Sequence, residues 1–411
     1  MSDSLKPTPL FPILLVNFIG MLGFSIVLPF LVFLVTDFGG NAFIYGLVGA
    51  MYPGLQLIGA PILGRLSDKY GRRKILLVSQ AGTLLSWVIF LSAFFIPVEP
   101  LLEYSSSITG SFVLTWPLII VFFARAFDGL TGGNIAVANA YLADITPPEK
   151  RNVNFGKMGI SFSLGFIVGP ALAGLLGALG YGNHLPVIAA LLISFIAVFL
   201  IYFYLPESNG KSKGDYQQKE KPTIGFILRL PHIGYMLGMY FMVFLGFHLF
   251  YTAFPVHAIE NLNWDVSQTG IFFTIMSTIM VVVQGPILKS VSSKVKEPIL
   301  IIFGGIILGT NFLLYFPSNT AITYFAVILF SLGNGLMWPS VQAFLSKITP
   351  AEHQGVVQGF AGSFGSLAGV IGLIAGGFFY SSLSTDVFIF SAVIIYFVAI
   401  MAIRLLKIET Q

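Results

Sequence analysis

The sequence predicts an all-α membrane protein with twelve transmembrane helices in two pseudo-symmetric six-helix bundles. Its 411 residues are 56% hydrophobic and only 9% charged, whereas soluble domains are about 25% charged. Apolar stretches of about 20 residues, the length that crosses a hydrocarbon core, recur along the whole chain. One long polar stretch, at residues 206–223, separates the first six apolar stretches from the last six.

The predicted helices follow the apolar stretches in chain order. They span residues 11–34, 44–64, 75–97, 116–143, 154–179, 185–205, 232–256, 267–288, 298–316, 321–346, 355–380 and 386–406. The 44 glycines and 22 prolines of the chain do not oppose this prediction. In lipid the backbone must satisfy its own hydrogen bonds, and neighbouring helices absorb the kinks that Gly and Pro introduce.

The basic residues predict how the chain is oriented in the membrane. With a cytoplasmic N-terminus, all but one of the 21 Lys and Arg residues fall on the cytoplasmic side. They are Lys6, the five at 65–74, Lys150, Arg151, Lys157, the five at 211–229, Lys289, Lys294, Lys296, Lys347, Arg404 and Lys407. Because basic loops stay inside, both chain ends are expected in the cytoplasm. The net charge of +4 reflects this bias and does not indicate a partner nucleic acid.

The composition also predicts what the protein lacks. The chain has no cysteine, and its five histidines do not cluster at the spacing of metal ligands, so we expect no metal, no cofactor and no covalent catalyst. Residues 1–10 are short and weakly charged and lead into a segment too long for a signal core, so the first helix is expected to be retained. We therefore expect a monomeric protein that is not an enzyme.

The chain is predicted to contain three parts and an internal duplication. Residues 1–205 form the first bundle, 206–230 a flexible cytoplasmic linker, and 231–411 the second bundle. At an offset of 203 residues, Ile-Thr-Pro at 145–147 recurs at 348–350, and Glu149 recurs as Glu352. At the same offset, four glycines recur: Gly156 as Gly359, Gly159 as Gly362, Gly169 as Gly372 and Gly174 as Gly377. At an offset of 225, Pro-Ile-Leu at 61–63 recurs at 286–288. This order predicts parallel repeats about an axis along the membrane normal.

Residues 64–74, GRLSDKYGRRK, form a basic loop between the second and third predicted helices. A loop that only sets orientation explains the lysines and arginines, but it explains neither Asp68 nor the two glycines. Gly71 permits a tight turn, and Gly64 is expected to allow close helix approach. The string closely resembles the loop signature of the major facilitator superfamily, and twelve helices in two halves fit the same family.

The resemblance implies a cytoplasmic latch that holds the two bundles together when such a transporter opens outward. The residues that match it are Gly64, Asp68, Gly71, Arg72, Arg73 and, at the end of the fourth helix, Asp144. Asp68 is expected beside the positive end of helix 11, and Arg72 is expected to pair with Asp144. The corresponding loop of the second half, at 289–298, lacks the pattern, so the latch is expected to be asymmetric.

Arg125 and Asp128 lie near the middle of the fourth predicted helix, among apolar neighbours. A charge at the bilayer centre costs roughly 2.5 to 3.5 kcal/mol on insertion scales, so it rarely occurs without a use. At i and i+3 the two charges share one face and offset each other. Arg125 and Gly129 resemble the family's buried Arg-x-x-x-Gly motif, in which the Arg is linked to proton transfer. Asp128 adds a titratable carboxylate; the alternative is a purely structural pair.

The fifth predicted helix contains GFIVGPALAG at 165–174. Its Gly165, Gly169, Pro170 and Gly174 resemble the antiporter signature of drug-efflux members of the superfamily. Generic glycine-mediated helix packing is the alternative explanation. Together with AYLADIT at 140–146, the stretch 125–177 is similar to the tetracycline/proton antiporter family. Asn17 stands where tetracycline exporters carry an acid in helix 1, which is a departure from that family.

Polar and aromatic residues mark a candidate substrate cavity in the helices that line the centre of this family's members. They are Asn17, Met21, Tyr52, Gln56, Asn134, Tyr240, Phe244, Tyr251, Gln284, Asn334, Trp338 and Gln342. His248 is added to Arg125 and Asp128 as a proton-coupling candidate, because imidazole titrates near neutral pH. For His248, a role in helix packing is the alternative.

These observations predict a proton-coupled secondary transporter that exports small amphiphilic organic molecules by alternating access, as in multidrug or tetracycline-type efflux. The expected partners are a small-molecule substrate, protons and the lipid bilayer, and the expected location is a bacterial inner membrane. One alternative is an importer or facilitator of a metabolite on the same fold. Another is a non-transporting membrane receptor or a membrane-embedded enzyme.

Overall fold

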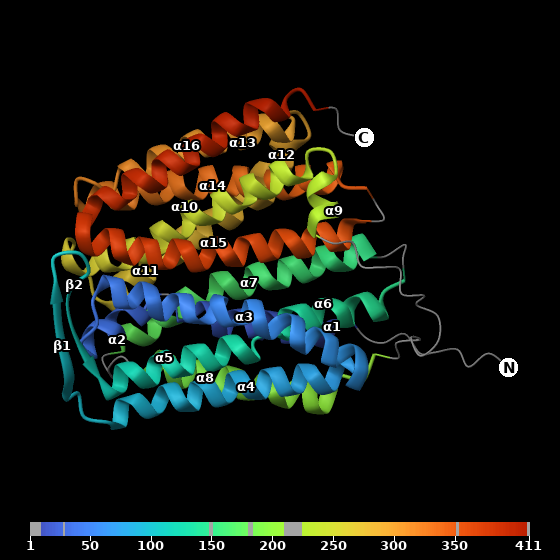
Figure 1. The fold of residues 1–411 in the computed structure, drawn as a ribbon. Coiled ribbons are helices and arrows are strands. Elements are labelled where there is room, and N and C mark those ends of the chain that lie inside the picture. The colour runs from blue at the N-terminus through green and yellow to red at the C-terminus, as the bar shows by residue number, and fades with distance from the viewer. Residues whose placement is uncertain are drawn as a thin grey trace. The chain divides into compact units, whose positions relative to one another are not determined.

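The computed structural model describes residues 10–27, 29–147, 151–179, 184–208, 224–350 and 353–408 (Figure 1). Most of the predicted linker, at 209–223, lies outside the described residues. So do Lys6, Lys150 and the repeated pair Glu149 and Glu352.

In the described residues before the polar stretch there are eight α-helices, whose bounds follow the apolar segments closely. They are α1 (Phe11–Ser25), α2 (Leu31–Asp37), α3 (Ala42–Tyr70), α4 (Arg72–Ser92), α5 (Trp116–Thr131), α6 (Asn134–Ile145), α7 (Arg151–Ala178) and α8 (Leu185–Tyr204). A β-hairpin that the sequence analysis did not predict, β1 (Pro100–Ser106) and β2 (Gly110–Thr115), connects α4 to α5.

The remaining helices follow the polar stretch. They are α9 (Ile224–Arg229), α10 (Ile233–Glu260), α11 (Val266–Val282), α12 (Leu288–Ser292), α13 (Glu297–Leu313), α14 (Thr320–Ile348), α15 (Gln354–Leu383) and α16 (Val387–Leu405). A π-helical turn, η3 (Val283–Ile287), joins α11 to α12. It contains Pro286, which lacks a backbone N–H and disturbs the α-helical hydrogen bonds there.

Within the described residues, nine helical stretches are long and apolar enough to cross a membrane. One of the nine, Val356–Leu405, contains both α15 and α16. Two shorter apolar helices, α1 and α13, coincide with the first and ninth predicted spans. Each of the twelve predicted transmembrane segments therefore has a helical counterpart, and the predicted fold class is confirmed.

Two predicted helices are interrupted. The first predicted span divides into α1 and α2, with Pro29 between them. The fourth divides into α5 and α6 at Gly132. The carbonyls released at this second break are satisfied by side chains, because Ser79 Oγ donates to Thr131 O at 2.6 Å and Gln56 Nε2 donates to Gly132 O at 2.9 Å. Such compensation is what allows a broken helix inside a membrane protein.

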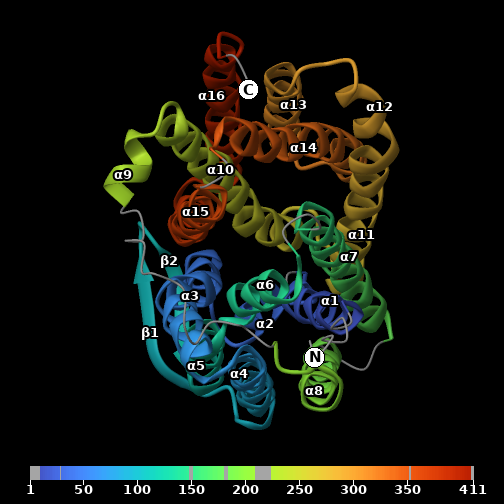
Figure 2. The ribbon, with the colours of Figure 1, turned by 90° about the vertical axis from the view of Figure 1, so that its right-hand side faces the viewer.

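The internal contacts of the chain divide it into two compact units. The first unit comprises Met1–Gly39, Met51–Leu102 and Leu114–Lys219, and the second comprises Gly40–Ala50, Glu103–Val113 and Glu220–Gln411. In the first unit α1 packs against α7 and α8, and in the second α13 packs against α14 and α16 (Figure 2). The domain boundaries expected from the sequence stay a prediction.

The two units have different cores. In the first, one cluster joins aliphatic residues of α1, α4, α6 and α8, such as Val16, Leu76 and Ile201, around the buried ring of Tyr141. In the second, Phe250 contacts several other rings, including Phe312 at 5.1 Å and Phe330 at 5.2 Å between centroids. Aromatic packing of this kind contributes large buried area to the second unit.

Candidate functional site

The buried ion pair of Arg125 and Asp128 is the centre of the candidate site. Both side chains project from α5 and are almost fully enclosed, with 5% and 6% of their surfaces exposed. Arg125 Nη1 lies 3.6 Å from Asp128 Oδ2, which is longer than the roughly 2.7 to 3.2 Å of a good N–H···O hydrogen bond. The charges therefore attract each other without a tight hydrogen bond at this contact.

Tyr52 and Gln56 of α3 complete this group of residues. The Arg125 guanidinium lies over the Tyr52 ring at 4.9 Å from its centroid, a cation–π contact that is strengthened by the exclusion of water. Gln56 Nε2 donates to the Tyr52 hydroxyl at 3.0 Å. The structure thus brings together four predicted site residues, two of them assigned to proton coupling and two to the substrate cavity.

On its α4 side the ion pair faces residues that sequence reasoning missed. A narrow crevice beside the pair is lined by Ser86, Trp87, Phe90, Ala124, Arg125 and Asp128. Thr83, one turn before this crevice on α4, interacts with the Asp128 carboxylate through its side chain. Hydroxyl and indole groups are common helix-packing residues, so nothing in the sequence distinguished these positions from ordinary packing.

Two glycines bring α3 close to α5 and so place Tyr52 on Arg125. A Cβ on Gly129 would clash with the Tyr52 carbonyl oxygen, and a Cβ on Gly59 would lie 2.7 Å from the carbonyl carbon of Leu130. Both approaches are shorter than real Cβ contacts, so the crossing requires glycine at both positions. Of the two, only Gly129 was part of a recognised motif.

A second cluster lies at the end of the first unit that carries the basic loop. Arg72 Nε donates to Asp144 Oδ2 at 2.9 Å, and its Nη1 approaches Asp68 Oδ1 and Ser67 Oγ, each at 2.6 Å. The ion pair predicted between Arg72 and Asp144 is therefore present. Ser208 Oγ also donates to Asp144 Oδ2, at 3.2 Å.

Gly71 occupies the tight turn expected of it, with φ of 104°, in the region that favours glycine. Glu207, which the sequence did not mark as a site residue, also contributes to this turn. Its Oε1 accepts a hydrogen bond from the backbone N–H of Arg73 at 3.0 Å. Arg73 in turn donates to backbone carbonyls at the end of α8, including that of Tyr202. Gly64 has no described atom within 4 Å of a Cβ position, and the close helix approach expected there stays a prediction.

The second unit contains an ion pair at the positions that the sequence repeats relate to Arg72 and Asp144, with the two charges reversed. Lys347 Nζ donates to Glu297 Oε1. The offset of 225 that relates Pro61 to Pro286 also relates Arg72 to Glu297, and the offset of 203 relates Asp144 to Lys347. The second half thus lacks the residue pattern of the basic loop but has an ion pair with exchanged signs at the related positions, and the asymmetry of the latch stays a prediction.

A charge exchange tests this relationship. Glu297→Lys or Lys347→Glu alone is expected to lower the thermal stability of the purified protein, because each places like charges together. The double variant is expected to recover it. The effect should be about 1 kcal/mol or less, since Lys347 is 47% exposed and exposed pairs are weak. If the double variant shows only the sum of the two single losses, the pair does not interact.

The glycines of the antiporter-type motif pack α7 against α1. A Cβ on Gly165 would lie 2.9 Å from Met21 Cβ, and one on Gly169 would lie 2.8 Å from the Ile26 backbone nitrogen. Gly174 is buried on the same helix, and Pro170 lies inside it without ending it. Two cavity candidates, Asn17 and Met21, are buried at this interface, and Asn17 Nδ2 donates to Met158 O at 3.2 Å.

Cavity candidates of the second unit form an aromatic group. The rings of Tyr240, Phe244 and Trp338 have mutual centroid distances of 4.9 to 5.0 Å, and the Gln342 side chain interacts with the Tyr240 hydroxyl. The other candidates lie elsewhere. Tyr251 stacks on Phe273, Asn334 Nδ2 contacts Met280 Sδ at 3.5 Å, Gln284 lies in η3, and Asn134 begins α6.

His248 is held by packing and by a backbone hydrogen bond. Its Nδ1 lies 2.7 Å from Phe244 O, and its ring stacks on that of Phe244 at 5.7 Å. On the other side, glycines of α15 make room for it, since a Cβ on Gly372 would lie 2.7 Å from His248 Cβ. This geometry favours the packing alternative that the sequence left open.

His248→Gln therefore tests the two roles of this histidine. Glutamine keeps a hydrogen-bonding side chain of similar length but cannot titrate near neutral pH. Substrate-driven proton movement in vesicles is expected to stay within about twofold of the original protein, because packing is retained. Loss of proton movement with intact folding would instead assign proton coupling to His248.

Comparisons with known proteins agree with these features. A sequence profile of the Major Facilitator Superfamily matches residues 13–372 and, in a second alignment, 236–411. The chain is 27% identical over 372 residues to the class D tetracycline resistance protein of Salmonella ordonez, covering 90% of this chain and 88% of that protein. It is 30% identical over 333 residues to the class G tetracycline resistance protein of Vibrio anguillarum, covering 80% and 78%.

A solved structure also shares the fold. The crystal structure of the human organic anion transporter MFSD10 aligns with a TM-score of 0.65 and 18% identity, covering 96% of this chain and 98% of that one. The apolar helices and the sequence relatives define a multi-pass integral membrane transporter. The chain belongs to the Major Facilitator Superfamily.

Proposed function

We propose that this transporter exports small amphiphilic organic molecules from the cytoplasm in exchange for protons. Asp128 carries the proton. Protonation from the outside weakens the attraction between Asp128 and Arg125 and favours release of substrate outward. After the bundles switch, the carboxylate loses the proton to the cytoplasm and pairs with Arg125 again.

The enclosed ion pair of α5 is the observation that carries this proposal. Its carboxylate is nearly buried and lies 3.6 Å from the guanidinium, so protonation removes an attraction that water screens only weakly. Arg125 also contacts Tyr52, whose helix α3 belongs to the crossing held by Gly59 and Gly129. A change in the charge of Asp128 is thus transmitted directly to a second helix.

The proposed substrate class rests on two further observations. Tyr240, Phe244 and Trp338 form an aromatic group, which suits flat apolar or weakly cationic molecules. The two sequence relatives above are named for tetracycline resistance. Asn17 replaces the acid expected of tetracycline exporters, so we propose a broader efflux specificity than tetracycline itself.

We further propose that the protein works as a monomer in a bacterial inner membrane, with both chain ends in the cytoplasm. We also propose that Arg72, Asp68 and Asp144 act as the cytoplasmic latch. The three side chains already share hydrogen bonds within one unit. These pairs hold the basic loop against the end of α6 within that unit, which orders the side chains that the proposed latch uses.

The first test measures internal pH in proteoliposomes that contain the purified protein. Cationic, neutral and anionic amphiphiles are added in turn to vesicles with and without an imposed pH gradient. A compound that triggers proton movement opposite to its own flux supports antiport and identifies the substrate class. Transport of a compound without proton movement would contradict the proposal and favour a facilitator.

A further inference from the structure

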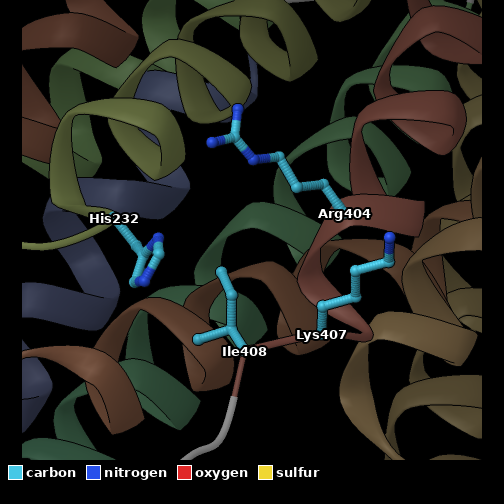
Figure 3. Close-up of a pocket in the computed structure, with 4 residues that line it drawn as sticks. All are labelled: His232, Arg404, Lys407 and Ile408. Atoms are coloured by element: carbon cyan, nitrogen blue, oxygen red, sulfur yellow. The ribbon is translucent and has the colours of Figure 1, made fainter.

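A positively charged pocket lies in the second unit, where α10 begins and α16 ends (Figure 3). It is an open depression of about 440 Å³ lined by His232, Arg404, Lys407 and Ile408. This volume falls within the range of about 300 to 1,000 Å³ that is typical of small-molecule sites. Two of the four lining residues carry a permanent positive charge, and no described carboxylate is among them.

An aromatic contact holds Arg404 in place. Its guanidinium lies 5.2 Å from the centroid of the Tyr235 ring, and the Tyr235 hydroxyl donates to Met401 O at 2.7 Å. Among the described residues, the salt bridges do not include Arg404 or Lys407. Within that part of the chain, neither positive charge is taken up by a carboxylate, and both face the pocket.

The third polar residue occupies an unusual backbone position. His232 has φ of 61°, in the left-handed region that few residues other than glycine adopt. It immediately precedes the 28 residues of α10 and makes no capping hydrogen bond with its side chain. The first backbone N–H groups of a helix carry partial positive charge, so the start of α10 adds to the positive potential of the pocket.

The surroundings of the pocket are apolar. At the end of α16, the Ile403 side chain is 51% exposed, and Leu406 in the turn that follows is 49% exposed. In α9, Phe226 is 46% exposed and Leu228 is 43% exposed. Both α10 and α16 are apolar enough to cross a membrane. A site at the end of such helices, with exposed apolar side chains beside it, is placed where phospholipid headgroups meet acyl chains.

We propose that this pocket binds the phosphate of an anionic phospholipid in the cytoplasmic leaflet. Arg404 and Lys407 contact the phosphate, the imidazole of His232 donates a hydrogen bond, and the acyl chains lie along the exposed apolar side chains. The inference does not depend on proton coupling or on the direction of transport.

Native mass spectrometry of the purified protein in detergent micelles tests the proposal. The probes are phosphatidylglycerol and phosphatidylcholine of the same chain length. The protein is expected to retain phosphatidylglycerol preferentially. Because a basic residue near an anionic lipid surface contributes about 1 kcal/mol, Lys407→Gln should weaken retention about fivefold, and adding Arg404→Gln should weaken it about 25-fold.

The controls separate pocket binding from general charge. Lys294→Gln with Lys296→Gln removes two exposed basic residues that do not line the pocket, and retention is expected to be unchanged. Lys407→Arg, which keeps the charge, should restore binding. Equal losses in the pocket and control variants would overturn the proposal, as would unchanged retention in both. Lys407→Gln is measured first, because Tyr235 holds Arg404 and the second substitution risks the fold.

A last measurement separates a lipid from a free anion. Inorganic phosphate is titrated into the lipid-free protein, and phosphatidylglycerol is then added. Displacement of phosphate by the lipid, dependent on Lys407, supports a headgroup site. Phosphate binding that phosphatidylglycerol does not displace assigns the pocket to a soluble anion and overturns the proposal.

Discussion

Asp128→Asn is expected to abolish substrate-driven proton movement in proteoliposomes, down to the level of vesicles without protein. Asparagine has nearly the same shape and can still accept a hydrogen bond, but it cannot titrate. Since the proposed cycle depends on protonation next to Arg125, net transport against a gradient should stop. Exchange of labelled for unlabelled substrate, which needs no net proton movement, should persist.

Two further variants make this result interpretable. Asp128→Glu keeps a carboxylate and is expected to retain part of the proton movement. Glu103→Gln removes an exposed carboxylate of β1 and is expected to change nothing. Full coupled activity of Asp128→Asn would refute the proposed proton site and leave Asp128 as a structural partner of Arg125. Loss of folding, measured by size-exclusion chromatography, must be absent for the comparison to count.

Gly169→Ala is expected to have the second large effect, on stability. The added methyl group would lie 2.8 Å from the Ile26 backbone nitrogen and 2.9 Å from the Ser25 carbonyl carbon. These are backbone atoms of α1, so they cannot rotate away as a side chain would. Overpacking of this kind costs about 1 to 3 kcal/mol, and here we expect the upper end. The melting temperature in detergent should fall by several degrees.

Gly159→Ala is the matched control on the same helix. No described atom lies within 4 Å of a Cβ at this position, and alanine favours a helix by about 1 kcal/mol over glycine. Its stability should be unchanged or slightly raised. Equal loss at both positions would show that α7 does not depend on close contact with α1 at Gly169. The antiporter-type motif would then lack the packing role that the structure assigns to it.

The second unit shows how far a sequence repeat can be interpreted. The repeated Ile-Thr-Pro and Pro-Ile-Leu strings supplied the two offsets, but residue identity alone suggested that the loop at 289–298 had lost its partner. The ion pair of Glu297 and Lys347 became visible only in three dimensions. An ion pair requires only opposite charges, and either order of signs satisfies it.

The β-hairpin and the broken fourth helix mark the limits of hydropathy. Residues of β1 are mostly exposed, so they lack the alternating burial that identifies a strand in a sequence. The break between α5 and α6 falls at Thr-Gly-Gly-Asn, residues 131–134, inside a stretch whose mean hydropathy is still that of a membrane span. Its cost is offset by hydrogen bonds from Ser79 and Gln56. Such compensation depends on neighbours in space.

The sequence by itself determined the membrane class, the twelve apolar segments, the superfamily and the isolation of Arg125 and Asp128 in an apolar helix. These depend on composition, segment length and local strings, which the bilayer constrains directly. The tertiary structure alone decided which residues surround that pair, that Glu207 caps the start of α4, and that His232 meets Arg404 and Lys407 in one pocket. These contacts join distant parts of the chain, and helix packing is what brings them together.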